Sequence, residues 1–250
     1  MTELLSVKIA KTAPSGATAV AVPVYSDRLS KVPGVRKAAM ERGGFTGGVG
    51  QTMVLDDGES TRVLVGLGAS TEAGTAELRT AAAVFARTVS RHRRAAFDYP
   101  EDLDLDPSDG VRAVTEGLVL GAYRFDVYKS SSKPGLDAAT IAVGDRVRSV
   151  QDGAARGRAT AEAVCFARDL VNEPGGSLTP AIFAERAAER AAAAGLTAEI
   201  MDLDAITEAG LGGLLAVNQG SVEPPRLLKL TYLPAAAGDD EVVEGETPEP

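Results

Sequence analysis

The hydrophobic positions of the first 145 or so residues switch between short runs rich in β-branched residues and longer stretches with helical spacing. This alternation is typical of an α/β domain. Several of the short runs are continuously apolar, as expected of strands that are covered on both faces. The predicted strands are residues 6–10, 17–24, 51–55, 62–65, 95–97 and 139–143.

Three helices are predicted between and after these strands. The first has an apolar stripe that ends at Val89, and Thr75 is its expected N-cap. The second covers residues 108–125, with Ser108 as its cap. The third covers about residues 157–171 and follows a break in composition at residues 151–157, where we expect an exposed linker.

The remaining sequence predicts a second, smaller unit. Thr179 and Pro180 are typical of a helix start, and this helix should end at Gly195. Strands are predicted near residues 197–201 and 227–233, with a short helix at 204–209, and the last 16 residues have the composition of a loop. About 60 residues with so few strands bury only a marginal core, so this unit resembles the opening of a larger domain.

Composition and charge exclude several classes of protein. A single cysteine, Cys165, and a single histidine, His92, argue against a disulfide-stapled fold and against most zinc sites. The net charge is −9, and removing six acidic residues of the segment 235–250 leaves −3. Such a balance disfavours nucleic-acid binding, although Arg87, Arg91, Arg93 and Arg94 form one basic cluster. No run reaches the roughly 20 apolar residues of a membrane span, so we expect a cytoplasmic protein.

The candidate chemical motifs are weak when taken one at a time. Gly66 and Gly68 follow a strand, but the third glycine of a dinucleotide fingerprint is absent, which favours a tight turn. The segment 43–50 lacks the Lys and Ser/Thr of a P-loop and suggests a mobile loop. His92 is expected at the surface and Cys165 in a packed helix. The acidic pairs Asp98/Glu101, Asp102/Asp104 and Asp202/Asp204 fit solvated turns.

Three longer stretches nevertheless resemble the leucyl aminopeptidases, also called cytosol aminopeptidases, which are two-metal exopeptidases. They are EGLVLGAYRFDVYKS (116–130), ARDLVNEPGGSLTPAIFAERA (167–187) and GLGGLLAVNQGSVEPPRLLKLTY (210–232). The second matches the family pattern R-D-L-x-N-x-P-x-x-x-L-T-P from Arg168 to Pro180. In the third, Gln219, Gly220, Ser221, Pro224, Pro225 and Arg226 fit the family pattern.

The resemblance implies an α/β fold with a macro-like N-terminal domain over residues 1–150, a bridging helix over 151–172 and the start of a peptidase catalytic domain over 173–250, with an acidic loop at 235–250. The intact enzyme would remove N-terminal residues from peptides with zinc or manganese and assemble as a homohexamer. The family's ligand motifs, G-K-G-x-x-F-D-S-G-G and N-T-D-A-E-G-R, do not occur here.

Because those motifs are absent, no residue of this sequence inherits a catalytic, cofactor-binding or metal-binding role, and the chain alone is expected to be inactive. The segments 172–179 and 219–226 are expected to brace the site. The alternative, a macro-like ligand-binding or interaction module without catalysis, stays open at this point.

Overall fold

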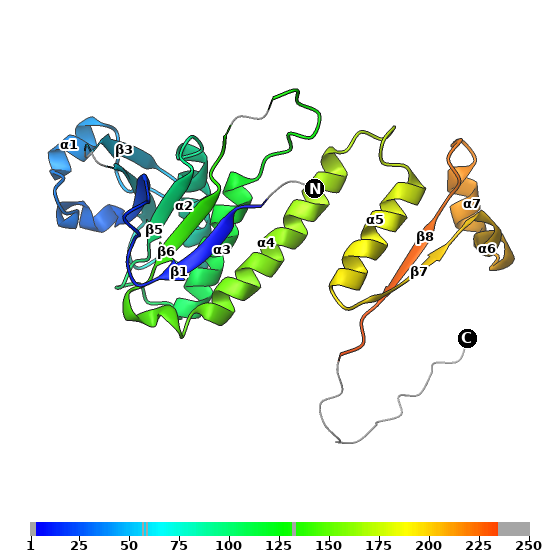
Figure 1. Ribbon diagram of the computed structural model, residues 1–250. Helices are drawn as coiled ribbons and strands as arrows, with labels where there is room; N and C mark the ends of the chain where they lie inside the picture. Colours follow the sequence, from blue (N-terminus) through cyan, green and yellow to red (C-terminus); the bar gives the residue numbers. More distant parts are fainter. Residues whose placement is uncertain (1–3, 57, 59, 132–133, 235–250) are drawn as a thin grey trace, which may run out of the picture. The chain divides into compact units, whose positions relative to one another are not determined.

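The computed structural model describes residues 4–56, 58, 60–131 and 134–234, which form two compact units joined after Asn172. The first unit is a mixed α/β domain built around one sheet, and the second is a small α/β unit (Figure 1). Each unit is described by itself below.

The sheet of the first unit has six strands in the order β1-β6-β5-β2-β4-β3. They are β1 (Ser6–Ala10), β2 (Ala19–Tyr25), β3 (Thr52–Asp56), β4 (Thr61–Gly68), β5 (Arg94–Asp98) and β6 (Ala138–Ala142). All neighbours pair in parallel except β3, which runs antiparallel to β4 along one edge. The six predicted strands are therefore all present, with ends displaced by at most a few residues.

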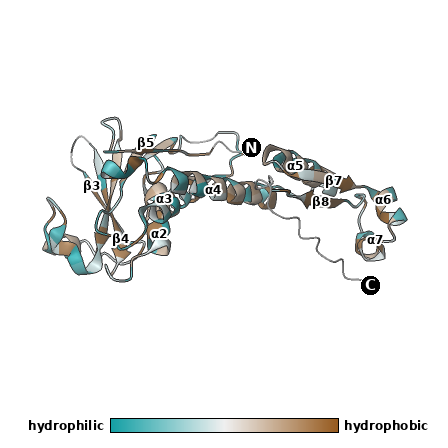
Figure 2. Cartoon of the chain, turned by 90° about the horizontal axis from the view of Figure 1, so that it is seen from below, coloured by the Kyte–Doolittle hydropathy of each residue, from teal (hydrophilic) through white to brown (hydrophobic). Residues whose placement is uncertain are grey.

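Three helices pack on one face of this sheet: α2 (Thr75–Thr88), α3 (Pro107–Ala122) and α4 (Gln151–Asn172). Figure 2 shows them lying side by side along the sheet. Inward side chains of alternate strand positions, such as Ala21, Val63 and Phe97, meet the apolar stripes of the helices and form the larger core.

The opposite face of the sheet is covered at the β2-β4-β3 end. A short 3₁₀ helix, η1 (Ser26–Lys31), and helix α1 (Lys37–Arg42) lie there, and a second 3₁₀ turn, η2 (Gly144–Val147), follows β6. Leu29, Met40 and Phe45 pack there against Val24 and Leu64 of the sheet in a smaller core.

The three large helices approach one another closely through glycines. A Cβ on Gly117 or Gly121 of α3 would lie 2.3 or 2.4 Å from a backbone oxygen of α2. A Cβ on Gly153 or Gly157 of α4 would lie 2.0 or 2.6 Å from a backbone oxygen of α3. Only glycine leaves room for these contacts, so both helix pairs depend on glycines spaced four residues apart, which share one helix face.

The structure corrects the predicted helix starts. The N-cap of α2 is Gly74, whose amide donates to Glu77 Oε2 at 3.0 Å, and not Thr75. Asp106 caps α3 by accepting from the Ser108 and Asp109 amides, and Pro107 takes the first helical position. Residues 151–157, expected as a linker, form the first turns of α4, because their glycines serve helix packing.

The second unit has a two-stranded antiparallel sheet of β7 (Thr197–Met201) and β8 (Leu227–Thr231) with helices α5 (Pro180–Ala193), α6 (Leu203–Glu208) and α7 (Gly212–Asn218). Thr179 caps α5 by accepting from the Ile182 amide at 3.4 Å, which confirms the predicted start. Figure 2 shows apolar colouring along β7 and β8. The predicted tail at residues 235–250 lies outside the described residues.

Among the described residues, no helix is long and apolar enough to cross a membrane.

Candidate functional site

The sheet topology places a crevice at the carboxyl ends of β2 and β5. From β2 the chain first builds one side of the sheet, through β3 and β4, and then returns to add β5 and β6 on the other side. In open α/β sheets, ligands bind at such a switch point, outside the carboxyl ends of the strands. Tyr25 ends β2 here, and Asp98, Tyr99 and Asp102 follow along β5 and its loop.

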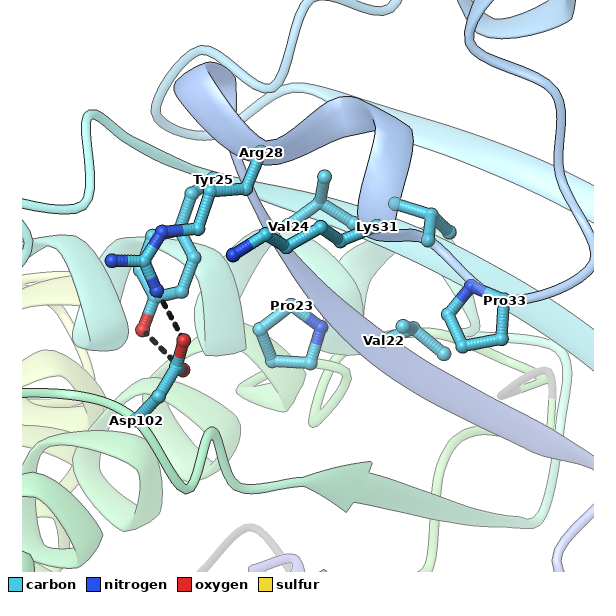
Figure 3. A pocket seen from close by; sticks show the side chains of 9 residues that line it. Val22, Pro23, Val24, Tyr25, Arg28, Lys31, Pro33 and Asp102 are labelled. Atoms are coloured by element: carbon cyan, nitrogen blue, oxygen red, sulfur yellow. Dashed lines mark hydrogen bonds and ion pairs between the residues drawn. The ribbon is translucent and has the colours of Figure 1, made fainter.

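Tyr25, Arg28 and Asp102 form a polar cluster at this crevice (Figure 3). The Tyr25 hydroxyl donates to Asp102 Oδ1 at 3.3 Å, and the Arg28 guanidinium forms an ion pair with Asp102 Oδ2. The same guanidinium lies 5.1 Å from the centre of the Tyr25 ring, in cation–π contact. Burial, together with the Asp102 charge, raises the pKa of Tyr25 to about 12, so its hydroxyl stays protonated and serves as a donor.

A pocket of about 160 Å³ lies beside this cluster. Its apolar lining comes from β2 and from the segment that follows η1, namely Val22, Pro23, Val24, Val32 and Pro33, and its polar end is made by Tyr25, Arg28, Lys31 and Asp102. The sequence does not predict this cluster, and Asp102 was expected in a solvated turn. The signal that could have found it is Tyr25, directly after the predicted strand 17–24.

A second groove, of about 520 Å³, lies along the ends of β1, β5 and β6. Burial raises the pKa of Asp98, which lines this groove, whereas Lys11 and Asp145 form an exposed ion pair at 2.6 Å on it. Tyr99 next to Asp98 is 5% exposed, and burial raises its pKa to about 12. Asp98 is thus not the fully solvated turn residue that was predicted.

The glycine-rich segments are used for packing of backbone on backbone. The Gly68 amide donates to the Gly47 carbonyl at 2.9 Å, and a Cβ on Gly66 would lie 2.0 Å from the Gly48 oxygen. Gln51 Oε1 accepts from the Thr46 and Gly48 amides. The tight-turn interpretation is wrong for Gly66, which lies inside β4 and pairs with Val24 of β2, whereas Gly68 ends the strand with a φ of 77°. Within the loop at 43–50, Gly47 and Gly50 are hydrogen-bonded to the backbone of β4.

The basic cluster lies at the opposite, amino end of the strands. His92 Nδ1 is 3.0 Å from Thr18 Oγ1, and Arg93 pairs with Asp137, while an open groove is lined by Arg91 and Arg94 as well. His92 is partly exposed, in line with the surface position expected for it.

Two of the motif stretches meet at the ends of α3 and α4. The Tyr123 hydroxyl donates to Asp169 Oδ1 at 2.9 Å and accepts from Asn172 Nδ2 at 3.1 Å. Arg168 stacks over the Tyr123 ring at 5.4 Å and donates to the Leu120 carbonyl at 3.2 Å. Residues of the R-D-L-x-N pattern therefore fasten the end of α4 to the end of α3.

Cys165 is buried in α4 at 2% exposure, and burial raises the pKa of its thiol. It is therefore a packed side chain with little thiolate character.

In the described ranges, no three His, Cys, Asp or Glu side chains come together in a way that could hold a metal ion. These residues therefore do not fit the two-metal centre that the resemblance implies for the intact enzyme, and no catalytic step is derived from them.

Two models of one peptidase family match this chain in succession. The N-terminal domain of the cytosol aminopeptidase family matches residues 17–132, and the catalytic domain of the same family matches residues 165–244. The fold and the order of these matches define the chain as part of a member of a peptidase family that has an N-terminal α/β domain. The chain belongs to the cytosol aminopeptidase family and corresponds to its N-terminal part.

Curated relatives agree with this assignment. A probable cytosol aminopeptidase of Syntrophotalea carbinolica is 32% identical over 225 residues, which are 84% of this chain and 45% of the relative. One from Mycobacterium ulcerans is 36% identical over 225 residues, 88% of this chain and 42% of the relative. The chain thus spans less than half the length of these relatives.

Solved structures show the same fold. The bottromycin maturation enzyme BotP is 38% identical with a TM-score of 0.75, covering 88% of this chain and 47% of BotP. A tomato leucine aminopeptidase, at 21% identity, has a TM-score of 0.78 over 90% of this chain and 50% of that one. A mixed α/β N-terminal domain followed by the start of a catalytic domain is therefore confirmed.

Proposed function

We propose that these 250 residues are the N-terminal portion of a cytoplasmic leucyl-type aminopeptidase that, when intact, hydrolyses the N-terminal residue from peptides. The observation that carries the proposal is the succession of the two family domains on one chain. The names of the curated relatives support the cytosol as its location.

Two divalent cations, zinc or manganese, would activate a water molecule and polarise the scissile carbonyl in the intact enzyme. A BotP structure in complex with manganese supports a divalent metal. The ligands belong to the two family motifs that do not occur in this sequence. The chain by itself is therefore expected to be inactive, and the intact enzyme is expected to be a homohexamer by resemblance.

In this proposal residues 1–150 form the macro-like N-terminal domain, α4 is the bridging helix and residues from 173 begin the catalytic domain. The Tyr123 network then has a positioning role, because it fixes the residue at which α4 ends. The alternative of a stand-alone macro-like module without catalysis has no support in the comparisons.

Two experiments test the proposal. The reading frame beyond codon 250 should continue and contain both ligand motifs, whereas a stop codon there would favour the stand-alone module. The purified chain, assayed on leucine 4-nitroanilide with added zinc or manganese, should show no hydrolysis, and elemental analysis after dialysis should find well under one metal ion per chain. Stoichiometric metal with hydrolysis that a chelator abolishes would place the active site within these residues.

A further inference from the structure

The pocket beside Tyr25 combines an apolar lining with an uneven set of charges. Asp102 is its one carboxylate, and that carboxylate is already engaged by Arg28 and Tyr25. Lys31 adds a second cation, and in the described part of the chain it has no ion-pair partner. The pocket lining therefore carries one positive charge in excess.

The geometry directs that charge into the pocket. Figure 3 shows the Lys31 side chain extending from η1 over Pro23 towards the end of the pocket where Arg28 and Tyr25 lie. The opposite end is apolar and is walled by Val22 and Pro33. A ligand bound here meets a cation at one end and aliphatic surface at the other.

The volume limits the size of the ligand. About 160 Å³ corresponds to roughly five water molecules at the share of about 30 Å³ that each takes in the liquid. A compact organic molecule suits a space of this size, whereas a peptide or a nucleotide would protrude from it.

From this lining we infer that the pocket binds a small monocarboxylate with a branched aliphatic body, whose carboxylate pairs with Lys31 and whose carbon chain packs on Val22, Pro23 and Pro33. The site lies at the carboxyl ends of the strands, where α/β sheets bind small ligands. The pocket shares no residue with the peptidase motifs. The experiments below can therefore refute the ligand-binding inference without refuting the proposed function, and the reverse also holds.

Calorimetric titration of the 250-residue chain with 4-methylpentanoate tests the inference. A ligand of eight non-hydrogen atoms in an open pocket should bind with a Kd of about 1 mM. Lys31→Met keeps the aliphatic stem and should weaken binding about tenfold, because a charge-assisted contact is lost. Lys37→Met is the matched control, since Lys37 is an exposed lysine of α1 that pairs with Glu41 outside the pocket. It should leave the Kd unchanged.

Two further probes and a spectroscopic readout complete the test. The uncharged 4-methylpentanamide should bind at least tenfold more weakly than the acid, and inorganic phosphate should not compete with it. In methyl-labelled protein, the Val22 and Val32 signals should shift on titration, whereas Val54, exposed on β3, should not.

Four results would overturn the inference, and the first three concern the ligands: no saturable heat up to about 20 mM ligand, equal binding of the amide, or equal binding of phosphate. Equal binding of phosphate would show a general anion site to which the apolar wall contributes nothing. Unchanged affinity in Lys31→Met, with the valine shifts present, would refute the role of that lysine and with it the ligand class.

Discussion

Replacing Ile206 by alanine should unfold the second unit while the first stays folded. Ile206 in α6 is fully buried, and the other buried aliphatic side chains among the described residues of this unit are Ala184 and Ala191. The first unit contains both of the larger cores, so one substitution in the second unit should affect that unit alone.

The magnitude follows from the exposure of its large side chains. Full burial of such a side chain is worth about 1.5 to 3 kcal/mol. Phe183, Ile200, Leu214 and Leu230 remain 39 to 46% exposed, which forfeits about 2 to 5 kcal/mol over the four. Truncating a buried isoleucine removes about 2 to 5 kcal/mol more. Together these losses approach the whole net stability of a domain, about 5 to 15 kcal/mol.

Amide hydrogen exchange read by mass spectrometry measures this loss region by region. In the unaltered chain, peptides from α5, β7 and β8 should exchange faster than those from β2, β4 and β5. In Ile206→Ala they should exchange at the rate of an unfolded chain, with the first unit unchanged. Ile200→Ala is the control, because its side chain is already 42% exposed and little packing is lost.

Slow exchange in α5 and β7 of Ile206→Ala would refute this reasoning. It would mean that the second unit has a core beyond the side chains that are buried here. Equal protection of both units in the unaltered monomer would also count against a catalytic domain of which only the opening is present.

Three further outcomes are expected. Gly153→Ala should lower the melting temperature, because overpacking costs about 1 to 3 kcal/mol and the clash is with backbone, whereas Gly213→Ala, with nothing within 4 Å, should not; equal effects would exclude helix contact as the cause. Tyr123→Phe should lower the free energy of unfolding by about 1 kcal/mol in urea titration, and this loss should vanish when Asp169 and Asn172 are already alanine; persistence there would show that the hydroxyl acts elsewhere. Burial raises the pKa of Asp98 in the folded state above its ordinary value near 3.8, so its ionisation destabilises the fold as pH rises through that range. Asp98→Asn should therefore stabilise the protein at pH 7 but not near pH 3, and a gain of equal size at both values would assign the effect to packing.

The strands were predictable because they are short, mostly apolar runs between turns, and period and composition are visible in the sequence. The starts of the helices were less predictable from the sequence. Thr75 and Ser108 are good caps by type, but Glu77 reaches back to Gly74 and Asp106 precedes a proline. Which of two adjacent residues becomes the N-cap depends on how far the nearby side chains can reach, and a pattern of residue types does not contain that information. Helices α1 and α7, of six and seven residues, were not predicted, although the six-residue α6 was. So short a stretch shows less than two full helical periods and is a weak signal.

Glycine caused the largest misreading. The composition around Gly153 and Gly157 predicts a linker, yet both residues lie inside a 22-residue helix and face the backbone of α3. Glycine occurs in turns because its backbone is conformationally free, and it occurs at close helix contacts because it has no Cβ. Only the surface that packs against the glycine shows which of these two roles it has. The Tyr25 cluster was missed for a related reason, because its members lie up to 77 residues apart in the chain.

Helix α4 can also be considered as a lever. It touches α3 through Gly157, and the chain leaves the first unit 15 residues later at Asn172, about 22 Å along the helix axis at 1.5 Å per residue. Pivoting by 5° about the glycine contact would move that exit point by about 2 Å. Such a displacement is comparable with what separates productive from unproductive alignment in an enzyme. The hydroxyl of Tyr123, through its hydrogen bonds with Asp169 and Asn172, therefore restrains the helix where the lever arm is longest.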